Sequence, residues 1–147
     1  MIAYLDTSAI VKLLARDEDG SELVRELLDA SDGAVASRLA YPEARAALAA
    51  AERAGRLGGR QHALAKGDLE RALSSLAIVE LDPGLAKAAG EVAERFRLRA
   101  YDAVHLVSAL VVDEGDTVVV TWDRALASAA EDAGPGVAPP VGRRSPR

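Results

Sequence analysis

Cysteine is missing from this 147-residue chain, and histidine occurs only twice. Without cysteine the protein has no disulfide bond, no thiolate nucleophile and no cysteine-based zinc site. No apolar run approaches the roughly 20 residues that a membrane-spanning helix needs. The first residues, MIAYLD, lack the basic start and the long apolar run of a signal peptide. We therefore expect a soluble cytoplasmic protein with no membrane partner.

An excess of positive charge is also missing, because the formal net charge at pH 7 is −5. The charges are nevertheless unevenly distributed: acidic residues gather between positions 17 and 32, and arginines between positions 38 and 60. The arginine-rich segment could receive a polyanion such as a nucleic acid. It could equally be the solvated face of a helix, so the charge pattern alone does not decide the function.

Half of the residues are hydrophobic, which is enough for one domain with a substantial core. Short apolar or β-branched runs predict strands at residues 2–5, 34–37, 76–81 and 117–121. Helical patterns cover residues 8–15, 20–30, 41–55, 61–73, 83–97, 99–110 and 125–134, and Ser21 is a candidate cap of the second. We expect residues 1–134 to form the domain. Residues 135–147 should hold at most a short edge strand before a disordered tail rich in proline and arginine.

Strands that alternate with helices predict an α/β fold, with a mainly parallel sheet covered by helices on both faces. In such folds the ligand site lies beyond the carboxyl ends of the strands. Asp6 follows the first strand directly, and Asp123 follows the 117–121 strand after one residue. Glu43 and Asp102 stand in the first turns of helices that should begin at the same edge. Four carboxylates from distant parts of the sequence are therefore expected to converge.

Each of these acids also has a purely structural interpretation. Asp6 and Asp123 could cap the helices that follow them, and Glu43 and Asp102 are ordinary acids for a first helical turn. His105, in an otherwise apolar helix, reads as a satisfied histidine in or near the core. Taken together, however, carboxylates gathered at one sheet edge would repel one another unless a cation lay among them.

Hard oxygen ligands, with no cysteine and no paired histidines, favour Mg²⁺, or Mn²⁺ as its substitute, over zinc. A divalent ion held by carboxylates suits phosphoryl chemistry, because it activates a water molecule and shields the charge on the phosphate. Asp102 is therefore predicted to face a metal ion.

Four segments resemble the PIN-domain family, and specifically VapC-type toxin ribonucleases of bacterial toxin–antitoxin pairs: YLDTSAIVKL, SRLAYPEARAAL, LRAYDAVHLVSAL and VVVTWDRAL. They occur in the family's order and spacing and cover almost the whole chain except the tail. The resemblance implies a single PIN-like domain with about five parallel strands. It also implies a Mg²⁺-dependent endoribonuclease that cleaves RNA, forms a homodimer and is inhibited by a cognate VapB-type antitoxin whose C-terminal segment covers the active site.

The family's acidic quartet falls on Asp6, Glu43, Asp102 and Asp123. We expect Asp6 and Asp102 to be the primary metal ligands and Glu43 to orient or deprotonate the attacking water. Asp123 would hold that water, or a second ion roughly 4 Å from the first. The predicted supporting residues are Thr7, Ser8 and Thr121, which could bond to the metal's waters or to the scissile phosphate, and Arg45 and Arg99, which could bind RNA phosphates.

The main alternative is a catalytically silent PIN-like module that binds RNA or a protein partner without cutting it. The complete quartet speaks against this, because a pure binder has no need of clustered carboxylates that repel phosphate. A metal-dependent nuclease that acts on DNA is a further possibility. Transfer RNA, ribosomal RNA and messenger RNA all stay open as substrates.

Overall fold

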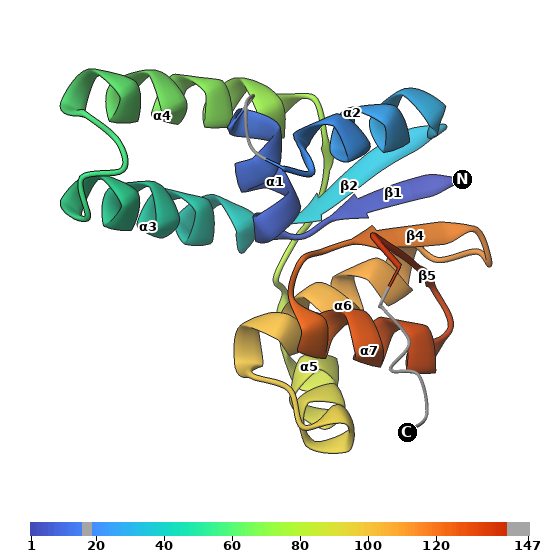
Figure 1. The fold of residues 1–147 in the computed structure, drawn as a ribbon. Helices are drawn as coiled ribbons and strands as arrows, with labels where there is room; N and C mark the ends of the chain where they lie inside the picture. Colours follow the sequence, from blue (N-terminus) through green and yellow to red (C-terminus); the bar gives the residue numbers. More distant parts are fainter. Residues whose placement is uncertain (16–18, 141–147) are drawn as a thin grey trace, which may run out of the picture.

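The computed structural model describes residues 1–15 and 19–140, which form a three-layer α/β domain (Figure 1). A parallel five-stranded sheet with the order β3-β2-β1-β4-β5 is the middle layer. Its strands are β1 Ile2–Leu5, β2 Gly33–Ser37, β3 Ala77–Val79, β4 Thr117–Val120 and β5 Gly136–Ala138. The predicted fold class is therefore confirmed.

Helices cover both faces of the sheet, as Figure 1 shows. One face carries α1 Thr7–Leu14, α2 Ser21–Ala30, α3 Ala40–Arg53 and α4 Gly59–Ser74, and the other carries α5 Pro83–Phe96, α6 Ala100–Val112 and α7 Arg124–Ala133. Neighbouring strand residues face opposite layers. Leu5 accordingly packs in the α1–α4 core, and Tyr4 packs against α6 and α7.

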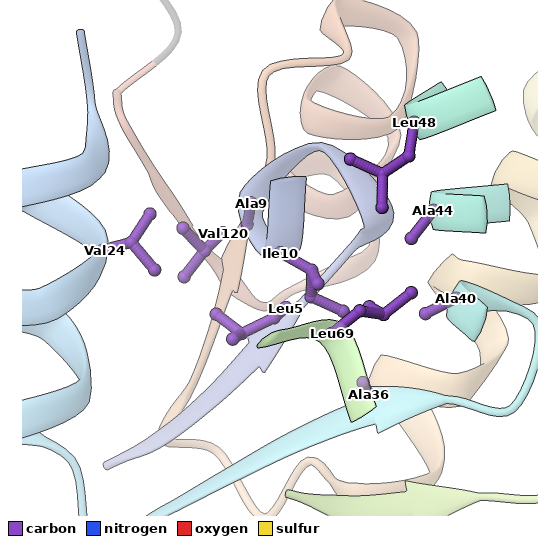
Figure 2. Close-up of a cluster of buried hydrophobic side chains, with 10 residues drawn as sticks. All are labelled: Leu5, Ala9, Ile10, Val24, Ala36, Ala40, Ala44, Leu48, Leu69 and Val120. Atoms are coloured by element: carbon purple, nitrogen blue, oxygen red, sulfur yellow. The ribbon is translucent and has the colours of Figure 1, made fainter. Parts of the chain in front are cut away.

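The core on the α1–α4 face combines a few large side chains with many alanines (Figure 2). Leu5, Ile10 and Leu69 are fully buried at its centre. Ala40 and Ala44 lie on α3 and are also fully buried, and their small side chains let that helix pack closely with α1 and α4. Helices α1 and α3 follow β1 and β2 in the chain, so both begin at the carboxyl edge of the sheet.

The strand register brings the chain ends of β1 and β4 together. Leu5 lies opposite both Ala36 of β2 and Val120 of β4. The next residues, Asp6 and Thr121, therefore leave the sheet side by side. Helix α6 precedes β4 in the chain and runs back toward the amino end of that strand, so its own first turn lies at the same carboxyl edge.

The structure corrects some local expectations. The cap of α2 is Gly20, with φ +94°, and Ser21 is the first helical residue, so the cap prediction at Ser21 is wrong. Strand β3 spans only Ala77–Val79. The predicted tail lies outside the described residues from position 141 onward. In the part of the chain that the structure describes, every helix is too short or too polar to cross a membrane.

Candidate active site

A pocket of about 440 Å³ opens at the carboxyl edge of the sheet. It is lined by all four predicted acids, Asp6, Glu43, Asp102 and Asp123, together with Thr7, Ser8, Val11, Lys12, Ala47, Arg99 and His105. The acids come from the end of β1, the first turns of α3 and α6, and the start of α7. The tertiary structure thus places residues 6 and 123 in one cavity.

Asp6 is the most buried of the four acids, with 4% of its surface exposed. Its Oδ1 accepts hydrogen bonds from the Ala9 amide at 2.9 Å and the Ser8 hydroxyl at 2.6 Å, and its Oδ2 accepts one from Thr121 at 2.5 Å. Burial raises the pKa of Asp6, against the opposing effect of these three donors. Asp6 is therefore the N-cap of α1, as the sequence predicted, and it also lines the pocket.

Asp102 and Asp123 are bridged by Arg99. The guanidinium donates from Nε to Asp102 Oδ2 and from a terminal nitrogen to Asp123 Oδ2, at 2.8 Å each. Asp123 also caps α7, because its Oδ1 accepts from the Ala125 and Leu126 amides. A cation thus lies between two of the predicted metal ligands, as expected if these carboxylates need positive charge to lie close together.

Glu43 accepts two hydrogen bonds at one oxygen. The Thr7 hydroxyl donates to Glu43 Oε1 at 2.8 Å, and the same oxygen lies 2.6 Å from His105 Nε2. Partial burial on its own would raise the pKa of Glu43, but the His105 contact and the Thr7 hydroxyl more than offset it and hold that pKa below its ordinary value. Glu43 is therefore ionised at neutral pH.

His105 is a site residue that sequence reasoning missed. It is almost fully buried, as expected for a core histidine, but one of its partners is the pocket carboxylate Glu43. Its other ring nitrogen, Nδ1, lies 2.8 Å from the hydroxyl of Tyr4. The signal was its spacing, because His105 is three residues after Asp102 on one helix, and residues three apart share a helix face.

The predicted supporting hydroxyls contact carboxylates. Ser8 and Thr121 donate to Asp6, and Thr7 donates to Glu43. Ser8 and Thr121 in turn accept from the backbone amides of Trp122 and Asp123. These hydroxyls therefore orient the acids and tie the end of β1 to the end of β4.

The two predicted phosphate-binding arginines differ in position. Arg99 lines the pocket, whereas Arg45 is not part of the lining and donates to the Tyr41 hydroxyl at 2.6 Å. Lys12 is a pocket cation that the sequence pattern did not single out. Its ammonium lies 5.0 Å from the centre of the Trp122 ring and donates to the Asp19 carbonyl.

The donors around the pocket suit a hard divalent cation, because they are carboxylate and hydroxyl oxygens with a single imidazole. Within residues 1–15 and 19–140, no three acidic or histidine side chains form a ready-made metal cage. Arg99 donates to one oxygen of Asp102 and to one of Asp123.

Comparison with known proteins identifies the family. Residues 3–132 match the PIN domain. Ribonuclease VapC49 of Mycobacterium tuberculosis (strain ATCC 25618 / H37Rv) is 47% identical over 138 residues, which cover 94% of this chain and 95% of the relative. This chain belongs to the PIN-domain family, with VapC ribonucleases as its relatives.

Solved structures share the fold. PAE2754 from Pyrobaculum aerophilum is 26% identical, with a TM-score of 0.67, and the match covers 93% of this chain and 89% of that one. VapBC2 from Rickettsia felis, bound to a DNA fragment from the VapBC2 promoter, is 17% identical, with a TM-score of 0.60 and coverage of 84% and 88%. At that identity the likeness concerns the fold alone.

Proposed function

We propose that this protein is an endoribonuclease toxin that uses Mg²⁺, or Mn²⁺ in its place, to cleave RNA. The observation that carries the proposal is the meeting of Asp6, Glu43, Asp102 and Asp123 in one pocket. The pocket belongs to a chain 47% identical to a protein named as a ribonuclease.

In this proposal Asp6 and Asp102 hold the cation, with Glu43 and Asp123 completing the oxygen ligands or holding a second ion. The bound cation would activate water and shield the phosphate charge. Glu43 is ionised and faces the pocket, so it can orient the attacking water and accept its proton. Arg99 can turn from the carboxylates to a phosphate oxygen, since its side chain is 74% exposed.

The test is cleavage of total RNA by the purified protein in EDTA, Mg²⁺, Mn²⁺ and Ca²⁺, with the new RNA ends mapped. We expect cleavage in Mg²⁺ and Mn²⁺ and none in EDTA. Asp102→Asn, purified in parallel, controls for a contaminating nuclease and should be inactive. Binding of RNA without cleavage under every condition would favour the silent binding module, and equal cleavage of DNA would widen the substrate class.

We further propose that a VapB-type antitoxin covers this pocket with an apolar C-terminal segment. A groove of about 140 Å³ runs beside the pocket, between α1, α3 and α4, and shares Val11 and Ala47 with it. Its other lining side chains are mostly apolar and include Leu14, Leu48 and Leu57. A single bound segment could therefore fill the groove and reach the carboxylates.

The antitoxin proposal is tested by co-expression with the product of any adjacent small gene. We expect the wild type to be toxic when expressed alone and the partner to relieve this toxicity. The purified complex should no longer cleave RNA in vitro.

We also propose a homodimer, which sedimentation at micromolar concentration would detect. A strictly monomeric species would contradict it.

A further inference from the structure

A buried hydrogen-bonded chain runs from the sheet to the pocket carboxylate Glu43. It begins at Tyr4 on β1, passes through His105 on α6, and ends at Glu43 on α3. The two contacts measure 2.8 and 2.6 Å, and Tyr4 and His105 are at most 2% exposed. Three elements far apart in the sequence thus meet through one imidazole ring.

The geometry requires a proton on Nε2 of His105. A bare Nε2 would point its lone pair at the ionised Glu43 oxygen 2.6 Å away, which is repulsive, so Nε2 must donate. On the other edge of the ring, Nδ1 lies 2.8 Å from the buried hydroxyl of Tyr4. The ring is therefore held between Tyr4 and Glu43, with Nε2 as the donor to Glu43.

The Thr7 hydroxyl donates to the same oxygen of Glu43, at 2.8 Å. Two donors from different elements on Oε1 fix the plane of the carboxylate and with it the direction of Oε2. Without these two donors, the Glu43 side chain could adopt several rotamers.

We propose that His105 is a positioning residue: held by Tyr4, it locks Glu43 in the orientation that the divalent cation and the attacking water require. The inference rests on the proposed function of the pocket and adds a residue outside the acidic quartet. Groups that orient a ligand of a metal ion typically change metal affinity or activity by about 10- to 100-fold when they are lost.

Two amide substitutions separate positioning from packing. His105→Gln places an amide nitrogen near the position of Nε2, where it can donate to Glu43. His105→Asn places its amide near the position of Nδ1, where it can contact only Tyr4. Both remove the ring, so a residue needed only for packing should respond to the two changes alike.

The measurements are Mn²⁺ affinity by titration calorimetry without RNA, and kcat and KM for RNA cleavage. For His105→Asn we expect Mn²⁺ affinity and kcat to fall by about 10- to 100-fold with little change in KM. His105→Gln should recover most of both. Tyr4→Phe, which keeps the ring of Tyr4 and loses its hydroxyl, should give an intermediate loss of Mn²⁺ affinity.

The chain offers a matched control. His62 contacts Glu52 through Nδ1 at 2.5 Å, and neither residue lines the pocket. His62→Gln moves the amide away from the Nδ1 position and so loses the Glu52 contact; it should leave Mn²⁺ affinity and kcat at the wild-type value. Melting temperatures of all variants without metal establish that each is folded under the assay conditions.

The outcomes separate the two proposals. If the wild type binds Mn²⁺ and cleaves RNA while His105→Asn matches it, the positioning role is overturned and the proposed function stands. Equal losses in the Asn and Gln variants would also overturn it, because only the ring would then matter. A wild type that neither binds Mn²⁺ nor cleaves RNA overturns the proposed function and the positioning role with it.

Discussion

At the scale of single residues, Asp6 and Glu43 are both pocket carboxylates, but the fold shifts their pKa values in opposite directions. Asp6 lies at the end of a central strand, where burial outweighs three hydrogen-bond donors and raises its pKa. Glu43 is only partly buried, and its contacts with His105 and Thr7 lower its pKa. The two acids should therefore affect folding stability with opposite signs.

Asp6→Asn should abolish cleavage without destabilising the metal-free protein. A carboxyl group whose pKa is raised in the folded state destabilises the fold when it is ionised. The free energy of unfolding therefore falls as the pH rises from the ordinary pKa to the raised one. The asparagine removes this charge and can still cap α1, since Asn and Asp are about equal as caps. Thermal unfolding in EDTA at pH 7 should show an equal or higher melting temperature. A clear drop would contradict the assignment.

Glu43→Gln should behave in the opposite way and lower the stability of the metal-free protein by about 1.5–3 kcal/mol at pH 7, the scale of a hydrogen bond to a charged group. A carboxyl group with a lowered folded-state pKa stabilises the fold above its ordinary pKa, and this is lost as the pH falls through the lowered value. The difference in melting temperature between wild type and variant should therefore shrink below about pH 4. A difference that does not change with pH would count against an ionised Glu43.

At the scale of elements, α6 contributes the most to the site. Its cap Arg99, its first-turn Asp102 and His105 one turn later all line the pocket. Arg99 bridges Asp102 to Asp123 of α7, so one side chain links the starts of two helices. A metal ion would have to compete with this guanidinium for the same oxygens.

Arg99→Gln should therefore change metal binding and cleavage in opposite directions. Mn²⁺ should bind more tightly, because a competing cation is gone. RNA should be cleaved less efficiently, with a higher KM, because a phosphate contact is lost. Arg45→Gln is the matched control, since Arg45 pairs with Tyr41 outside the pocket lining. It should leave Mn²⁺ affinity unchanged. Weaker Mn²⁺ binding in Arg99→Gln would show that Arg99 supports the site and does not compete in it.

The turn before α2 supports the same site from a distance. Gly20 has φ +94°, and a Cβ added there would lie 2.4 Å from the ring of Trp122, the residue before Asp123. Gly20→Ala should destabilise the protein by more than the roughly 1–2 kcal/mol that left-handed backbone alone costs.

Gly55→Ala is the control for Gly20→Ala, because Gly55 also has positive φ but a Cβ added there would meet no atom within 4 Å. It should show the backbone cost only. Equal losses of unfolding free energy in urea for the two variants would mean that the Trp122 contact does not matter.

At the scale of the whole molecule, the sign of the charge bears on how the proposed RNA substrate could bind. The chain carries a net charge of −5, and its pocket is lined by four carboxylates against Arg99 and Lys12. RNA phosphate should be repelled until a divalent cation reverses the local charge.

RNA binding should accordingly be weak in EDTA and stronger in Mg²⁺ or Mn²⁺, and added monovalent salt should not restore it. Ca²⁺ should permit binding but support cleavage poorly, because its looser coordination positions water less strictly. Binding and cleavage measured in parallel with these ions test this. Full RNA affinity in EDTA would contradict the charge argument.

The sequence by itself determined the α/β class, the parallel direction of the strands and the edge at which the four acids meet. Strand–helix alternation and the carboxyl-edge rule depend only on backbone geometry and on local patterns around Asp6, Glu43, Asp102 and Asp123. Two of these acids are both helix caps and pocket residues, so their structural and functional interpretations hold together.

Only the tertiary structure decided which side chains form hydrogen bonds with those acids. The partners of Glu43 lie 36 and 62 residues away, and Thr121 reaches Asp6 across 115 residues. Such contacts depend on strand register and on helix packing, which no local pattern encodes. For the same reason only the structure placed His105 and Lys12 in the pocket lining, and it placed Arg99 there but not Arg45, although the sequence singled out both arginines.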